Sequence, residues 1–227
     1  ILLPSFLVFR QPDLGTAIVI VIIGISIMFL AGVHLGYFFV AGVSSIGLLL
    51  LLFQSRGTSW QILKNYHYKR IDVFLNPSVD PLGTGYHITQ SKIALGSGGL
   101  FGKGFMQGSQ SQLNFLPEKH TDFIFTTLAE EFGFMGTIAL MVIYTLIILF
   151  CIISALSIKD RFGKLLTAGL CVTFFTYFSI NIAMVMGLVP VVGIPLPLIS
   201  YGGSSMIVVM ISFGLIQSAY VHRKGSF

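Results

Sequence analysis

The sequence has 227 residues, of which 55% are hydrophobic and only 9% are charged, and its mean hydropathy is +0.91. Soluble domains carry roughly a quarter charged residues, so this composition excludes an ordinary soluble domain and indicates an integral membrane protein. The apolar runs do not alternate with polar residues as barrel strands do, so we expect spanning helices. The net charge of +5 fits the excess of Lys and Arg on cytoplasmic loops and does not require a nucleic-acid partner.

Three long segments contain no Lys, Arg, Asp or Glu: residues 14–55, 132–158 and 165–222. In the first half, residues 1–9 are predicted to be the tail of a spanning helix. Residues 14–31 and 35–53 each have about the 20 residues that one membrane crossing needs. The short turn at 32–34 predicts that these two helices pack as an antiparallel hairpin. Because the chain opens inside an apolar run with no charged region before it, we expect it to begin within a longer protein.

Residues 54–122 form a long connection of a different character. They hold seven of the thirteen basic residues and four of the eight acidic ones. Residues 88–99 are predicted to form a short helix that ends in glycines, and residues 99–112 a loop. A connection of this length between two spans is usually functional.

The second half contains three further predicted spans, at residues 123–157, 165–187 and 204–221. Segment 188–205 is apolar but is broken by three prolines and three glycines. Such backbone is tolerated at membrane depth only where protein buries it or where it lines a cavity. The basic segments 159–164 and 222–224 are separated by two spans, and we predict that both are cytoplasmic. The 54–122 loop and the 188–203 segment then share the extracytoplasmic face.

The ionisable residues gather just before a long apolar run. Segment 113–136 reads LNFLPEKHTDFIFTTLAEEFGFMG and carries six of them within fourteen residues: Glu118, Lys119, His120, Asp122, Glu130 and Glu131. A chain that otherwise excludes charge is predicted to keep these groups for chemistry at a membrane surface. At least one of Glu130 and Glu131 is expected to pair inside the bundle, because an unpaired charge in lipid is unfavourable.

Four segments resemble the signature segments of one protein family: QPDLGTA (11–17), DPLGTGYHITQSKIALGSGGLFGKG (80–104), FLPEKHTDFIFTTLAEEFGFMG (115–136) and PLPLISYGGSS (195–205). They are similar to those of the SEDS family of cell-wall proteins (FtsW, RodA and SpoVE), and the residues of these motifs most resemble those of the RodA branch. The family has ten spanning helices. The resemblance therefore implies an all-α polytopic membrane bundle, of which this chain supplies five helices and part of a sixth. We expect one membrane domain, with spans in 1–53, the outer loop at 54–122, and spans and a cytoplasmic tail in 123–227.

The resemblance also implies an activity. SEDS proteins are peptidoglycan glycosyltransferases of the bacterial cytoplasmic (inner) membrane, which polymerise lipid II at its outer face and release undecaprenyl pyrophosphate. They work with a class B penicillin-binding protein, a transpeptidase, and the RodA branch serves the elongation machinery that gives rod shape. The essential Asp of the family's HTDF motif maps onto Asp122.

The reaction needs a carboxylate that takes the proton of the acceptor hydroxyl, and cationic or N–H groups that hold the departing phosphates. Asp122 is the candidate base, because it lies where the outer loop meets a helix; the alternative is a helix N-cap. Lys92, Lys103 and Lys119 are the candidate phosphate binders. The glycine-rich run 96–104 is not a P-loop, because Ser97 and Gly104 stand where that motif needs Gly and Ser or Thr.

The other candidates for substrate contact have structural alternatives. Glu118 is either a second carboxylate or a solvated charge, and His120 either orients Asp122 or binds backbone. Segment 200–204 is either a wall of the substrate groove or a tight packing surface of small residues. The candidates for substrate contact in these two places are Glu118, His120, Thr121, Ser200, Tyr201, Gly202, Gly203 and Ser204.

The sequence offers little evidence for a metal or for reactive cysteines. It contains no metal-ligand spacing such as His-x-x-x-His or Cys-x-x-Cys, which leaves open a Mg²⁺ or Mn²⁺ ion held by the pyrophosphate and one carboxylate. Cys151 and Cys171 lie in apolar runs and are interpreted as small core or lipid-facing residues. Asp13 is expected to cap the helix that follows it.

Two other hypotheses, a transporter and a scaffold, compete with the hypothesis of an enzyme. A transporter that flips lipid II needs polar groups through the thickness of the membrane or paired broken helices. In this chain the spans carry almost no charge and the polar groups gather on one face, which favours surface chemistry. A scaffold that only recruits the cross-linking partner predicts that Asp122 is dispensable.

Overall fold

The computed structural model describes residues 1–11, 13–57, 61, 65–80, 83–109 and 120–224, and the regular elements in these ranges are all helical. The helices are α1 (Leu2–Arg10), α2 (Leu14–Leu30), α3 (Leu35–Gln54), α4 (Asn65–Leu75), α5 (Thr84–Ser97), α7 (Ile124–Ser157), α8 (Arg161–Val185) and α9 (Gly203–Val221). Two short 3₁₀ turns, η1 (Pro77–Val79) and η2 (His222–Lys224), complete the described elements.

Four of these helices, α3, α7, α8 and α9, are long and apolar enough to cross a membrane. The apolar part of α2, Gly15–Leu30, is shorter. Charged residues stand at helix ends: the Asp13 carboxylate accepts from the backbone N–H of Thr16 at 3.0 Å, and Asp160 accepts from Gly163 at 2.7 Å. These bonds satisfy amides that have no partner inside the helix. The predictions of a polytopic all-α membrane protein and of the Asp13 cap are confirmed.

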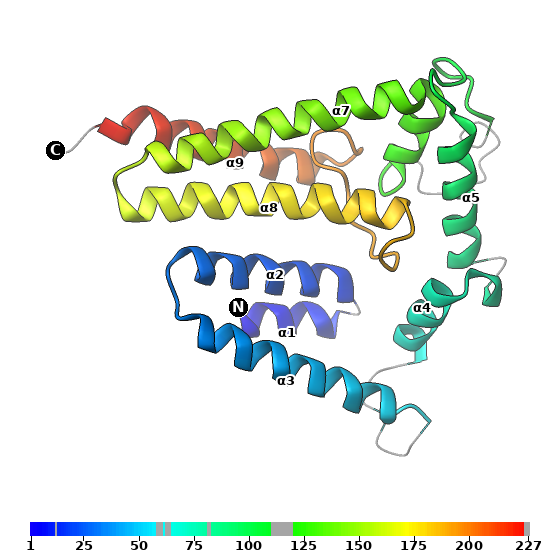
Figure 1. Ribbon diagram of the computed structural model, residues 1–227, viewed down its shortest axis with the longest axis horizontal. Helices are drawn as coiled ribbons and strands as arrows, with labels where there is room; N and C mark the ends of the chain where they lie inside the picture. Colours follow the sequence, from blue (N-terminus) through cyan, green and yellow to red (C-terminus); the bar gives the residue numbers. More distant parts are fainter. Residues whose placement is uncertain (12, 58–60, 62–64, 81–82, 110–119, 225–227) are drawn as a thin grey trace.

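The bundle is built from α7, α8 and α9, with α2 packed on α8 and α1 packed on α2 (Figure 1). The predicted antiparallel packing of α2 with α3 is wrong, since α3 diverges from α2 and no residue of α3 is buried. A short turn brings two helix ends together without deciding which faces meet. Gly15 lies on the face of α2 that approaches the segment after α8, and a Cβ on it would lie 2.6 Å from the carbonyl oxygen of Val192.

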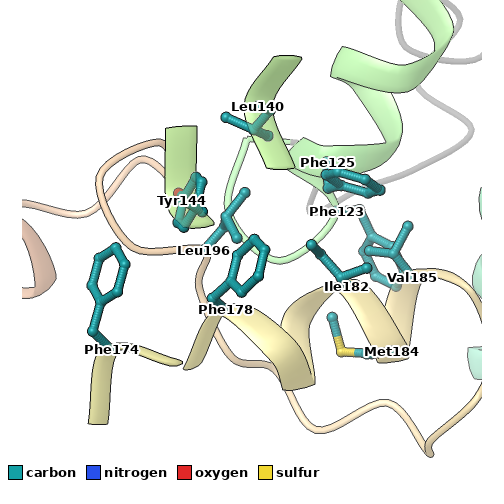
Figure 2. Packing of buried hydrophobic residues seen from close by; sticks show 10 residues of the cluster. All are labelled: Phe123, Phe125, Leu140, Tyr144, Phe174, Phe178, Ile182, Met184, Val185 and Leu196. Carbon is teal, nitrogen blue, oxygen red and sulfur yellow. The ribbon is translucent and has the colours of Figure 1, made fainter. Parts of the chain in front are cut away.

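The main core lies between α7, α8 and the irregular segment 188–202 that follows α8 (Figure 2). Tyr144 of α7 stacks on Phe178 with ring centroids 4.4 Å apart and on Phe174 at 5.5 Å. Its hydroxyl donates to the carbonyl oxygen of Pro197, so the broken segment is held by a buried side chain. A smaller cluster contains Cys151 and Cys171, which are buried free thiols, as their apolar surroundings predict.

The predicted span 123–157 is a single α7 with a sharp bend, seen at the top right of Figure 1. Gly133 has φ 65° and ψ −161°, a conformation that favours glycine and interrupts the helical ladder. The amides of Phe134 and Met135 donate to the carbonyls of Gly99 and Leu100 at 2.9 and 3.1 Å. The loop after α5 therefore supplies the hydrogen bonds that the bend removes from the helix.

Candidate functional site

Asp122 lies in the turn that leads into α7. The N-cap residue of α7 is Phe123, so Asp122 stands one residue before the cap position. The aspartate is half-buried, and its Oδ2 atom is 3.3 Å from the point where a Cβ would stand on Gly193. The carboxylate before α7 is thus brought against the irregular segment after α8, as expected if the two segments share one face of the bundle.

Hydrogen bonds from a distant part of the chain hold the backbone around Asp122. The side-chain nitrogen of Asn181 on α8 donates to the carbonyl oxygens of Asp122 at 2.9 Å and Ile194 at 2.6 Å. The hydroxyl of Ser200 donates to the carbonyl oxygen of Thr121 at 2.6 Å and accepts from the N–H of Leu196 at 2.7 Å. Asn181 and Ser200 are both buried, so these bonds are shielded from water and fix the position of the turn.

A third bond extends the same junction. The backbone N–H of Tyr201 donates to the carbonyl oxygen of His120 at 2.8 Å. The side chains of His120 and Tyr201 are exposed, and Tyr201 is 81% exposed. The structure therefore brings together two segments that carry candidate site residues far apart in the sequence, residues 120–122 and 200–201.

A cavity of about 340 Å³ adjoins this junction. It is bounded by α8, α9 and segment 193–200, and Gly193, which lies beside the Asp122 carboxylate, is part of its wall. The lining is mainly apolar, with hydroxyl groups from a few side chains: Thr16, Thr173, Tyr177, Ser200, Ser204, Ser205 and Ser212. A mainly apolar cavity with a few polar groups is typical of a binding site for a small or lipid-like molecule.

The two described lysines among the candidate phosphate binders lie in different surroundings. The Lys92 side chain is exposed, and its Nζ atom is 2.6 Å from where a Cβ would stand on Gly187, at the C-terminal end of α8. A cation is favoured there by the helix dipole. Lys103 forms an ion pair with Glu130 at 2.7 Å, and Glu130 is fully buried. The expectation that Glu130 or Glu131 pairs inside the bundle is confirmed for Glu130.

The glycines of run 96–104 have a structural explanation. A Cβ on Gly98 would lie 2.1 Å from the carbonyl oxygen of Ala129, and one on Gly102 would lie 2.1 Å from that of Glu131. These glycines let the loop approach the backbone of α7 around its bend. Their role in binding phosphate, and that of Lys92 and Lys103, stays a prediction.

The remaining predictions concern Glu118, Lys119 and a metal ion. Glu118 and Lys119 lie outside the described residues. Within the ranges that the structure describes, no three His, Cys, Asp or Glu side chains come close enough together to hold a metal ion.

Asn181 is the site residue that sequence reasoning missed. It is a fully buried amide within a span that carries no charge. Polar residues inside membrane spans are rare and usually have a partner or a function, and this signal was present in the sequence.

Comparisons with known proteins agree on the family. The family model FTSW_RODA_SPOVE, described as "Cell cycle protein", matches residues 1–225. The peptidoglycan glycosyltransferase MrdB of Escherichia coli (strain K12) is 46% identical over 224 residues, covering 99% of this chain and 59% of that protein. The peptidoglycan glycosyltransferase RodA of Treponema pallidum (strain Nichols) is 43% identical over 174 residues, covering 77% and 40%. The probable peptidoglycan glycosyltransferase FtsW of Trichlorobacter lovleyi is 37% identical over 210 residues, covering 92% and 53%.

A solved structure matches the fold. It comes from work on the structural coordination of polymerization and crosslinking by a peptidoglycan synthase complex. Its TM-score is 0.76 at 28% identity, over 98% of this chain and 60% of that chain. The matches thus span between 40% and 60% of the length of these relatives. The family match over residues 1–225 and the four motifs in order show that the chain belongs to the FtsW/RodA/SpoVE family of membrane proteins.

Proposed function

We propose that the protein is a peptidoglycan glycosyltransferase that polymerises lipid II into glycan strands for cell elongation and rod shape. Relatives at 46% and 43% identity carry the name of that activity. The observation that carries the proposal is the Asp122 carboxylate, which a buried network holds against Gly193 beside a mainly apolar cavity. Transfer from a lipid-linked sugar donor needs a positioned base for the hydroxyl of the acceptor and an apolar surface for the lipid chain of the donor.

In the proposed reaction Asp122 is the general base. Its carboxylate takes the proton from a sugar hydroxyl of the acceptor as that oxygen forms a bond to the anomeric carbon of the donor. The bond from that carbon to the pyrophosphate oxygen breaks, and undecaprenyl pyrophosphate leaves with its electron pair. Asn181 and Ser200 hold the backbone on both sides of the carboxylate, so little rearrangement is needed at the moment of reaction.

The other groups have supporting roles in this proposal. Lys92, Lys103 and Lys119 are the candidates for neutralising the pyrophosphate, and Lys103 is the weakest of them because its charge is already paired with Glu130. A Mg²⁺ or Mn²⁺ ion that accompanies the pyrophosphate belongs to the substrate.

We place the site on the extracytoplasmic side of the bacterial inner membrane. The short basic segments 159–164 and 222–224 then face the cytoplasm, in keeping with the excess of Lys and Arg on that side. We also propose a class B penicillin-binding protein as the partner, because a similar solved chain belongs to a complex that polymerises and crosslinks. A cross-linking enzyme at the same face would consume the glycan as it forms.

The test uses the full-length protein with its class B partner and purified lipid II. Asp122→Asn and Asp122→Ala are expected to reduce glycan polymer by about 10²–10⁴-fold, the usual contribution of a general base. Glu131→Gln changes a nearby half-exposed carboxylate and is the matched control. Polymer from the Asp122 variants at the wild-type rate would overturn the proposal. If the wild-type protein makes no polymer but moves lipid II across vesicles, it is a flippase. If it shows neither activity, it is a scaffold for the cross-linking partner.

A further inference from the structure

The loop after α5 exposes a group of large apolar side chains. Leu100, Phe101, Phe105 and Met106 are each between 62% and 80% exposed. Next to them the bend of α7 exposes Phe132, whose ring centroid is 6.2 Å from that of Phe105. Exposed apolar groups of this size that gather in one place mark an interaction surface.

The charged group of the same loop points toward α7. Lys103 is the one charged residue between positions 93 and 109, and its Nζ atom lies 2.7 Å from Glu130 and 2.9 Å from Ser109. Glu130 is fully buried beneath the loop. The loop is therefore amphipathic, with a polar side fixed to α7 and an uncharged apolar side directed outward.

The hydrogen bonds at the bend set the depth of this loop in the membrane. The part of α7 after the bend, residues 134–157, is about 36 Å long at about 1.5 Å per residue. The hydrocarbon layer is about 30 Å thick, and about 40–45 Å with its headgroups. With the end near Lys159 at one interface, Phe134 falls in the headgroup region of the other. Gly99 and Leu100, whose carbonyls bind the amides of Phe134 and Met135, lie at the same level.

We propose that residues 100–106 form a lipid anchor, in which Leu100, Phe101, Phe105 and Met106 insert into the boundary between headgroups and acyl chains. Apolar and aromatic side chains at this depth bind a bilayer surface. Lipid is the occupant because the patch continues along the exposed face of the membrane-crossing part of α7, through Phe134 and Ile138. The anchor holds the bent start of α7 at a fixed height, whatever reaction takes place there.

The test places the photoreactive residue p-benzoylphenylalanine at Phe101, and in a second variant at Phe105, of the full-length protein in its native membrane. Leu146, which is exposed midway along the part of α7 after the bend, serves as the lipid-facing control, and Ser78, which is exposed in η1, as the polar control. After irradiation, mass spectrometry is expected to find phospholipid adducts at both loop positions with a yield close to that at Leu146. Adducts to another protein alone, or a lipid yield no higher than that at Ser78, would overturn the anchor.

Discussion

The amide of Asn181 joins Asp122 to the segment after α8, because one nitrogen atom binds the carbonyl oxygens of Asp122 and Ile194 at 2.9 and 2.6 Å. The two acceptors belong to parts of the chain that lie on either side of Asn181 in the sequence. A single buried amide group thus fixes where the turn before α7 meets the broken segment. The position of the carboxylate follows from that junction and from the bond between Ser200 and Thr121.

The first prediction concerns Asn181→Asp, which keeps the size of the side chain and replaces the two N–H donors of the amide with at most one O–H donor. Each buried carbonyl left without its donor is expected to lower the free energy of unfolding by about 1–3 kcal/mol. We also expect glycan polymer to fall, because the turn that carries Asp122 is released. Thermal denaturation in detergent and polymerisation of lipid II measure the two effects. Ser179→Ala, two residues earlier on α8, is the control, and wild-type values for Asn181→Asp in both assays would contradict the junction described above.

The second prediction concerns Gly193→Ala. Gly193 has φ +69°, a conformation that costs other residues about 1–2 kcal/mol, and the new Cβ would lie 3.3 Å from Oδ2 of Asp122. The carboxylate has to move, so we expect the rate of polymerisation to fall strongly relative to wild type while the thermal stability falls only slightly. Gly214→Ala on α9 is the control, because a Cβ there meets no atom within 4 Å. Equal activity of the two variants would show that the contact with Gly193 does not position Asp122.

The third prediction concerns the ion pair between Lys103 and Glu130. Removing one member of a buried pair usually lowers the free energy of unfolding by about 3–5 kcal/mol, because the other charge is left without compensation. Glu130→Gln and Lys103→Met are each expected to destabilise strongly, and the double variant less than their sum. A double-mutant cycle by thermal or denaturant unfolding measures this, with Glu131→Gln as the control. Additive effects would mean that the two charges do not interact.

The fourth prediction concerns the pH dependence of the contact between α3 and α4. A double hydrogen bond and the charge of Arg56 hold the pKa of Asp72 below its ordinary value. A carboxylate with a lower pKa in the folded state stabilises the contact above the unfolded pKa of about 3.9. That contribution is lost as the pH falls through the folded pKa.

The pKa of Asp72 can be followed by NMR of its labelled carboxyl carbon. In Arg56→Gln we expect the midpoint to rise toward the ordinary value, because both the hydrogen bonds and the attractive charge are removed. Lys69→Gln removes the partner of Asp80 instead and should leave the midpoint of Asp72 where it is. An unchanged midpoint in Arg56→Gln would contradict this account.

The sequence predicted the membrane helices well, because a stretch without charge can be read directly from the residues. It also predicted that residues 120–122 and 200–204 would share a face, which follows from counting spans between basic turns. The packing partner of α2 could not be predicted in this way, because Gly15 acts only through contact with Val192. The same applies to the bend at Gly133, since the loop that supplies its hydrogen bonds lies about thirty residues earlier.

The candidate site was predicted in part. Asp122 stood out as a carboxylate at the edge of a span, and its family motif assigned it the same role. Asn181 did not stand out, although an amide within the charge-free stretch 165–222 is an available signal. Lys103 looked like a free cation because its partner, Glu130, is 27 residues away and buried only after folding.

The arrangement at the bend of α7 has a consequence for biosynthesis. A ribosome delivers residues 98–104 before it delivers Gly133, so the carbonyls that accept the amides of Phe134 and Met135 already exist when the helix emerges. During translation, α7 can therefore bend at Gly133 as it emerges, without first forming a straight helix across that residue.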